Sequence, residues 1–209
     1  IKVSSPKFSK ALTAEDYLPT PVNVKDVDAI ITDSTFYREY YPDMEDIPAP
    51  IYGNVNGSLG ITIEDSAGVD NYYMLTLYGD ENYYYYDWEN DTSIWTSYRN
   101  KIYITSNDAS ISSNDQTQSL LFTDELFDGQ NYQFKLDFED WSAQLEKVYE
   151  IELISLSRVS YLYRKTIAEY ENASGDPFSE PVVIYSNIEN GFGIFAGYSV
   201  SKYSFKLFE

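Results

Sequence analysis

The side chains best suited to bind a ligand lie in the aromatic segment 79–97, whose sequence is GDENYYYYDWENDTSIWTS. Tyrosine and tryptophan among Asp and Asn are residue types that stack on sugar rings or anchor protein contacts. In a strand, alternate side chains point to opposite faces, so at most half of the run 83–86 should be exposed. We therefore identify as candidate ligand-binding residues Tyr84, Tyr86, Trp88 and Trp95. The alternative, that alternate rings only cover the edge of the core, stays open.

No pattern in the sequence marks a catalytic site. The chain contains no His and no Cys, which removes the commonest general base, the usual Ser and Cys triads and nearly every transition-metal site. Ser199 and Lys202 have S-x-x-K spacing, but on a predicted strand an odd offset sends the two side chains to opposite faces. The many acids supply carboxylate pairs, yet no pair lies in a setting that marks a raised pKa for glycoside hydrolysis. We predict no catalytic residues and no enzymatic activity.

A metal site is not predicted either. Asp87, Glu89 and Asp91 alternate within the aromatic segment, which invites comparison with a calcium loop. The spacing lacks the Gly and the bidentate Glu of an EF-hand loop, so a solvated acidic loop explains it better. The sequence indicates no cofactor.

The charge of the chain limits its partners. There are 34 acids and 14 bases in 209 residues, a formal net charge of −20. Nucleic acid or anionic lipid would be repelled as a main partner, whereas a cationic partner is permitted. No run approaches the roughly 18 apolar residues of a membrane span. The chain begins with Ile1 rather than Met, so we expect that upstream sequence, able to carry a targeting signal, preceded it.

Alternating apolar residues predict strands through most of the chain. The period-two pattern is clearest in segments 59–64, 71–78, 130–138 and 145–153. One helix is predicted over 156–172, where five apolar residues follow helical spacing: Leu156, Val159, Tyr163, Ile167 and Tyr170. Ser155 or Ser157 can cap its start. The predicted fold is mainly β, an antiparallel β-barrel or β-sandwich with one packed α-helix.

The two ends of the chain differ in their predicted roles. At the C-terminus, a strand (181–186), a turn (187–193) and a long closing strand predict a hairpin that completes the β domain, with Gly193 and Gly197 suited to a bulge or a close backbone approach. At the N-terminus, residues 1–24 start abruptly and reach Pro19-Thr20-Pro21. We interpret 1–24 as the remnant and linker of a truncated domain, and 25–209 as the β-rich C-terminal domain.

Four stretches together resemble a known family. They are, in order, ITIEDSAGVDNYYMLTL (61–77), LFTDELFDGQNYQFKL (121–136), ISLSRVSYLYRKTIAEY (154–170) and FSEPVVIYSNIENGFGIFAGYS (178–199). The most specific piece is N-x-x-N-G-x-G-x-F-x-G-Y-S, from Asn187 to Ser199. The chain resembles the domain of unknown function 4249 family of Bacteroidota lipoproteins, well over 61–209 and loosely over 1–35.

The resemblance implies a location and a partner but assigns no catalytic residue. Members resemble outer-membrane lipoproteins with a lipobox Cys and an immunoglobulin-like domain ahead of this one, encoded beside TonB-dependent receptors. The resemblance therefore implies that residues 1–24 are the end of that immunoglobulin-like domain. It also implies cell-surface localisation through a lipid anchor that this chain lacks.

Two functions from different classes remain open. In the first, the protein is a non-enzymatic cell-surface accessory lipoprotein that binds a ligand or docks on a TonB-dependent receptor. In the second, it is a structural or assembly component of the outer-membrane surface with no small-molecule ligand.

Overall fold

The computed structural model describes residues 1–7, 10–38, 51–87, 89–108, 111–114, 118–174 and 179–208, and for 83–85, 93, 95 and 112–114 it describes the backbone alone. The fold is mainly β with one helix, which confirms the predicted fold class. The elements are β1 (Lys2–Val3), β2 (Leu12–Thr13), β3 (Val24–Arg38), β4 (Ile51–Glu64), β5 (Tyr72–Asp87), β6 (Thr92–Thr105), β7 (Ser112–Asn114), β8 (Ser119–Thr123), β9 (Asn131–Gln144), β10 (Val148–Leu156), α1 (Arg158–Ala173) and β11 (Tyr198–Lys206).

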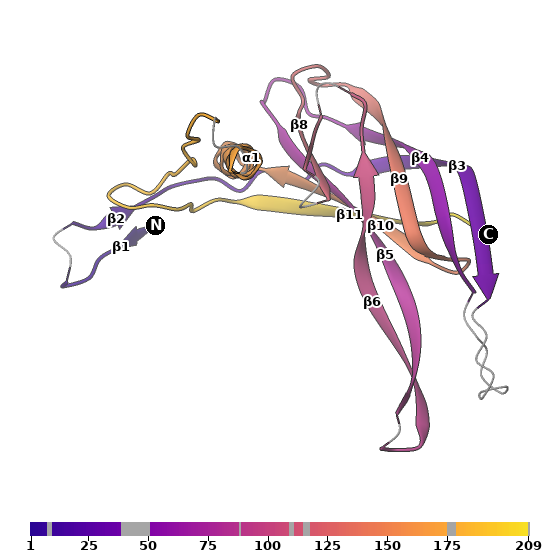
Figure 1. Cartoon of the computed structure of the whole chain (residues 1–209). Helices are drawn as coiled ribbons and strands as arrows, with labels where there is room; N and C mark the ends of the chain where they lie inside the picture. The colour runs from indigo at the N-terminus through magenta and orange to yellow at the C-terminus, as the bar shows by residue number, and fades with distance from the viewer. Residues whose placement is uncertain are drawn as a thin grey trace.

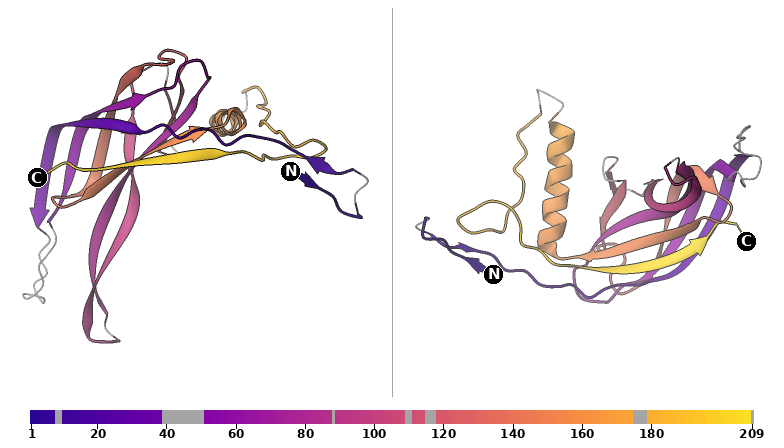
Figure 2. Two further views of the ribbon diagram at one scale, coloured as in Figure 1. Left: turned by 180° about the vertical axis from the view of Figure 1, so that it is seen from behind. Right: turned by 90° about the horizontal axis from the view of Figure 1, so that it is seen from below.

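Most of the described chain belongs to one antiparallel sheet of nine strands. Its order is β11-β10-β5-β6-β9-β4-β3, with β8 paired to β5 and β7 paired to β8. The sheet curls into an open half-barrel (Figures 1 and 2). β1 and β2 form a separate two-stranded sheet. The sequence predicted either a barrel or a sandwich, and the structure is an antiparallel half-barrel.

Strand β5 changes partners along its length. Its first residues, 72–75, pair with β8, and residues 77–87 pair with β6. On its other edge β5 pairs with β10 only as far as Gly79. Beyond that point β5 and β6 continue as a two-stranded hairpin that reaches away from the sheet (Figure 1). Residues 79–87 and 92–97 thus belong to the two arms of a long hairpin.

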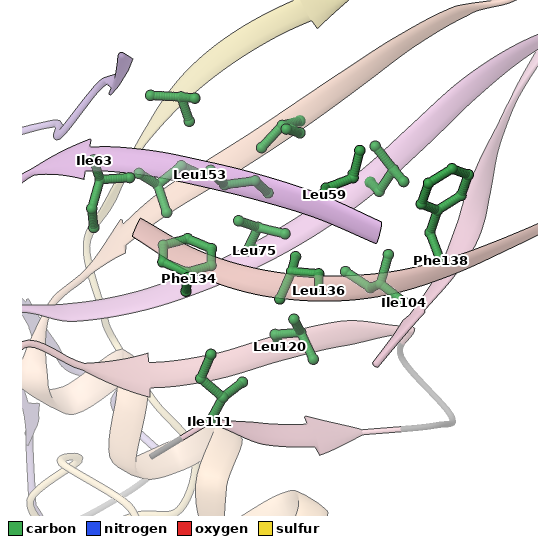
Figure 3. Close-up of a cluster of buried hydrophobic side chains, with 14 of the residues drawn as sticks. Leu59, Ile63, Leu75, Ile104, Ile111, Leu120, Phe134, Leu136, Phe138 and Leu153 are labelled. Atoms are coloured by element: carbon green, nitrogen blue, oxygen red, sulfur yellow. The ribbon is translucent and has the colours of Figure 1, made fainter. Parts of the chain in front are cut away.

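The core fills the inside of the curl. Alternate residues of four strands are buried, as the period-two pattern predicts, and many point toward one another in Figure 3. Those on the central strands are Leu59, Ile61, Ile63, Leu75, Leu77, Phe134, Leu136, Phe138, Ile151 and Leu153. Burying each such side chain is favourable by roughly 1.5–3 kcal/mol, so this alternation supplies most of the stabilisation of the sheet.

The same alternation places three charged side chains inside the curl. Counting in twos, the inward positions of β5 continue from Leu77 to Glu81, those of β9 from Phe138 to Asp140, and those of β10 back to Lys147. All three residues are buried, with at most 4% of each exposed. Charges at such positions are stable only when they are paired and hydrogen-bonded.

Lys147 is the centre of this buried group. Its Nζ lies 2.9 Å from Asp140 Oδ2 and 3.4 Å from Glu81 Oε1, and it donates to the Ser142 carbonyl at 3.2 Å. Tyr149 donates its hydroxyl proton to Asp140 Oδ2 at 2.7 Å. The buried ammonium therefore joins β5, the end of β9 and the start of β10.

Gly79 makes room for the Lys147 side chain. A Cβ atom at residue 79 would lie 2.3 Å from Lys147 Cε and 3.1 Å from Ile102 Cδ1. Because Lys147 is fixed by its bonds and fully buried, it cannot swing aside. A glycine is required here by space rather than by backbone conformation.

The predicted strand 181–186 is wrong. That segment runs beside α1 instead, and the Tyr185 backbone N–H donates to Thr166 Oγ1 at 2.9 Å. The expected hairpin is replaced by a loop that Asn187 closes, because its side-chain amide donates to the Phe195 carbonyl at 2.8 Å and accepts from the Phe195 N–H at 3.0 Å. The side chain thus makes the two bonds that a paired strand would make. The closing strand β11 is present as predicted.

Helix α1 begins at Arg158, with Ser157 as the N-cap that the sequence suggested. Leu156, the first residue of the predicted stripe, is instead the last residue of β10. The helix stands away from the sheet and contacts it near its first turns (Figure 2, right), where the Tyr161 and Tyr72 ring centres are 4.8 Å apart. No residue of α1 belongs to the core cluster of the described chain.

The N-terminal segment runs alongside the C-terminal one. Asp16 accepts hydrogen bonds from Ser157 Oγ and, at 2.7 Å, from the Gly197 N–H. A Cβ at residue 197 would lie 2.5 Å from the Tyr17 carbonyl oxygen, so Gly197 permits the close backbone approach that the sequence suggested. The interpretation of 1–24 as the remnant of another domain stays a prediction.

Gly79→Ala is expected to lower the free energy of unfolding by about 1–3 kcal/mol, because it overpacks the Lys147 site. Lys147→Ala should cost about 3–5 kcal/mol by leaving buried carboxylates unpaired. Urea unfolding of both variants and of the double variant measures the coupling. The double variant should lose less than the sum, and Gly60→Ala, which faces the flexible Gln133 side chain, should lose little. Strict additivity would contradict the assigned clash.

Candidate functional site

A cleft of about 620 Å³ lies between α1, the outer face of the sheet and the chain before β11. We call it the helix cleft. Its lining residues are Met74, Ser119 and Leu121 from the sheet, Ser160, Tyr163, Arg164, Lys165, Ile167, Ala168, Glu169 and Asn172 from the helix, and Ile194, Ala196 and Tyr198 from the C-terminal segment. Its volume falls within the roughly 300–1,000 Å³ of small-ligand pockets.

The helix cleft exists because α1 leaves part of its apolar stripe unpacked. Tyr163 and Ile167, two residues of the predicted stripe, line the cleft and are only half-buried. The core inside the curl is filled by residues of the strands and their connections, and none of its described members comes from α1. The helix lies instead on the outer face, at the position of Met74. An amphipathic stripe normally packs against the protein, and here it forms one wall of an open site.

Arg164 is the half-buried charged residue of this cleft, whereas Lys165 and Glu169 in its lining are exposed. Its side chain is half-buried, and its Nε atom is buried without a hydrogen-bond partner. No salt bridge to Arg164 is formed by the described residues. Burial lowers the pKa of Arg164, while the nearby hydroxyls of Tyr198 and Tyr163 act in the opposite direction. The guanidinium is therefore partly shielded from water, and no carboxylate of the described residues forms an ion pair with it.

The predicted aromatic site lies elsewhere, on the hairpin of β5 and β6. The backbone register pairs Tyr84 with Trp95, but the side chains of both residues, and Trp88 entirely, lie outside the described residues. Tyr86 is half-buried and donates its hydroxyl proton to Asp91. The assignment of Tyr84, Tyr86, Trp88 and Trp95 as ligand-binding residues stays a prediction.

The acids of that hairpin have local roles in the turn. Asp87 Oδ1 accepts from the Glu89 N–H at 3.0 Å, and its Oδ2 accepts from the Asn90 side chain at 2.8 Å. These bonds, led by the one from Asn90, lower the pKa of Asp87. Asp91 takes a positive φ of 50° in the same turn. The carboxylates of Asp87 and Asp91 thus accept hydrogen bonds within this turn.

A different group of carboxylates could hold a metal ion. Within the described ranges, oxygens of Asp65, Asp124 and Asp128 lie within 4.8 Å of one another. Several of these carboxylate oxygens already accept hydrogen bonds from the protein. Asp65 accepts one from the Tyr73 hydroxyl and one, at 3.0 Å, from the Gly129 N–H. Asp124 Oδ2 accepts from the Asn71 N–H at 2.9 Å. The arrangement joins the loops after β4 and β8, and nothing further identifies it as a metal site.

Burial perturbs this acidic group. Desolvation, together with the charge of Asp65, raises the pKa of Asp124 in spite of the Asn71 hydrogen bonds. Desolvation and the bond to Asp65 likewise raise the pKa of Tyr73 far above its usual range. Asp124 is therefore easier to protonate in the folded protein than in the unfolded chain.

Comparison with protein families places the chain among its relatives. The family described as Domain of unknown function (DUF4249) matches residues 1–204. The chain belongs to this family. Comparison with curated proteins and with solved structures returned no match. The family match includes residues 1–60, where the sequence resemblance was loose or lacking, and it assigns no activity.

The helix in the described part of the chain lacks the length and apolar composition of a membrane-spanning helix.

A cation on the apolar face of the predicted helix is the feature of the sequence that indicates the helix cleft. Arg164 follows Tyr163 and lies one turn before Ile167 and Ala168, so a cation occupies the apolar face of the helix. Stripe residues of a core helix are usually apolar throughout, and this interruption marks a face that is not buried in a core.

Asp124→Asn is expected to raise the melting temperature at neutral pH, because Asn keeps an acceptor for the Asn71 N–H and removes a charge that burial disfavours. A raised carboxyl pKa costs stability as pH rises from about 3.9 through the folded value, and the cost is complete above it. The gain should therefore vanish as pH falls toward 4. Melting curves between pH 4 and 8 test this, with the exposed Glu125→Gln as control. A gain that persists unchanged at pH 4 would contradict the assignment.

Proposed function

We propose that the protein is a non-enzymatic binding module that holds a small ligand in the helix cleft. The observation that carries this proposal is the cleft itself, in which part of the apolar helix face stays open and the Arg164 Nε is buried without a hydrogen-bond partner among the described residues. Concave, mostly apolar sites with a few placed polar groups are typical of ligand pockets. The lack of His and Cys among the residues of the chain favours binding over catalysis.

The family resemblance supports a place for this binding. We propose that the parent protein is a lipid-anchored protein of the outer-membrane surface, and that it delivers its ligand to, or docks on, a TonB-dependent receptor. The hairpin of β5 and β6, which reaches away from the sheet (Figure 1), is suited to such docking. Tyr84, Tyr86, Trp88 and Trp95 then serve a receptor contact rather than the ligand.

Filling the cleft should weaken ligand binding without unfolding the protein. Ala168 lines the cleft, so Ala168→Trp places an indole where the ligand would lie. Titration with the neutral fluorophore Nile red should show saturable one-to-one binding to the original protein and at least about tenfold weaker binding to this variant, a loss of about 1.4 kcal/mol. The matched control Ala29→Trp, at an exposed position of β3, should bind as the original protein does.

Equal Nile red affinity of Ala168→Trp and Ala29→Trp would contradict the proposal, since the dye would then bind outside the helix cleft. Melting temperatures of both variants should stay close to that of the original protein. Equal Nile red affinity of the two variants would favour a structural component without a small ligand.

A further inference from the structure

The state of Arg164 contrasts with that of the other well-placed cations in the described chain. Lys147, Arg99 and Lys202 each lie within 3.0 Å of a carboxylate oxygen. With the described residues Arg164 forms no such pair, although acids outnumber bases 34 to 14 in the sequence. Leaving a buried guanidinium nitrogen without a partner is unfavourable. The Arg164 Nε, which has no hydrogen-bond partner among the described residues, is therefore suited to a partner supplied by a ligand.

The surroundings of Arg164 restrict what that partner carries. Ile167, Ala168 and Leu121 line the same cleft, and Tyr163 and Tyr198 add aromatic rings. An apolar body in contact with these residues would bury the part of the helix stripe that the core leaves open. The ligand therefore combines an anionic group with an apolar chain.

The overall charge restricts the anion. A protein with a formal net charge of −20 repels multiply charged anions, and Glu169, an exposed residue of the cleft lining, adds to that repulsion. One guanidinium can balance one negative charge, and its planar fork matches a carboxylate. A singly charged carboxylate fits better than a phosphate.

We infer that the helix cleft binds a monocarboxylate carried on an apolar chain, with the carboxylate bound to the guanidinium of Arg164. The inference rests on the binding function proposed above and names the chemical class of its ligand. The apolar chain lies along Tyr163 and Ile167. Both an alkyl carboxylate and the free C-terminus of an apolar peptide have this chemistry.

Isothermal titration with matched probes tests the inference. Decanoate and decan-1-ol share an alkyl chain and differ in charge, and decyltrimethylammonium reverses that charge. The protein should bind decanoate about tenfold or more tightly than decan-1-ol, equivalent to about 1.4 kcal/mol, and should bind the ammonium compound more weakly than either. Trileucine and its C-terminal amide form a second pair, and the tighter of the two acids identifies the source of the carboxylate.

Two variants locate the effect. Arg164→Met keeps much of the apolar stem and should remove the preference for decanoate while leaving decan-1-ol affinity unchanged. Lys135→Met removes an exposed cation of β9 that does not line the cleft and should keep the preference. Because Arg164→Met removes an unpaired half-buried charge, its melting temperature should not fall.

The outcomes separate the inference from the proposed function. Equal binding of decanoate and decan-1-ol by the original protein would overturn the inference, and this measurement needs no variant to fold. A preference that survives in Arg164→Met, or is lost in Lys135→Met, would overturn it too. If Nile red still binds in the cleft in those cases, the proposed binding function stands. If neither Nile red nor any probe binds there, both fail.

Discussion

The buried pairing of Lys147 with Asp140 and Glu81 is the interaction on which the curl of the sheet depends. It lies where β5 parts from β10 and where β9 turns into β10, so three strands meet at one ammonium. A buried charge tolerates little displacement of its partners, because each lost bond leaves an unsolvated group. The pairing, with the space left by Gly79, therefore fixes where the hairpin of β5 and β6 leaves the sheet.

The position of the helix cleft follows from the filled interior of that curl. The described core residues come from the strands and their connections, and the helix that follows β10 lies on the outer face. Its start is anchored by hydrogen bonds to Asp16 from Ser157 and from the Gly197 N–H. Further along, α1 meets the C-terminal segment rather than the sheet, through Thr166 and Tyr185. A helix held at its start and along one side leaves an open space beneath its apolar stripe. The binding site is thus a consequence of how the core is completed without the helix.

The period-two pattern made most of the sheet predictable from the sequence. The same pattern also places the charged residues Asp140 and Lys147 at inward positions. Tyr132, Phe134, Leu136 and Phe138 were expected on one face, and one further step leads to Asp140. The step back from Tyr149 leads to Lys147. Alternation identifies inward positions whatever residue occupies them. The prediction was limited to apolar residues, and so it did not include these buried charges.

Other features could not be predicted because they depend on contacts between distant segments. Residues 181–186 have strand-forming side chains, yet their neighbour is a helix, and the Asn187 side chain takes the place of a pairing strand. The open stripe of α1 could not be distinguished from a core stripe without knowing that the interior is full. Asp65 is far in sequence from Asp124 and Asp128, and the turns after β4 and β8 bring the three residues together.

The most direct test of the account is the crystal structure of the protein soaked with a terminally brominated alkyl carboxylate. The account predicts anomalous bromine density inside the helix cleft, near Tyr163 and Ile167, with the carboxylate within hydrogen-bonding distance of the Arg164 guanidinium. Ordered ligand bound on the hairpin of β5 and β6, or lying in the cleft with its carboxylate directed away from Arg164, would contradict it.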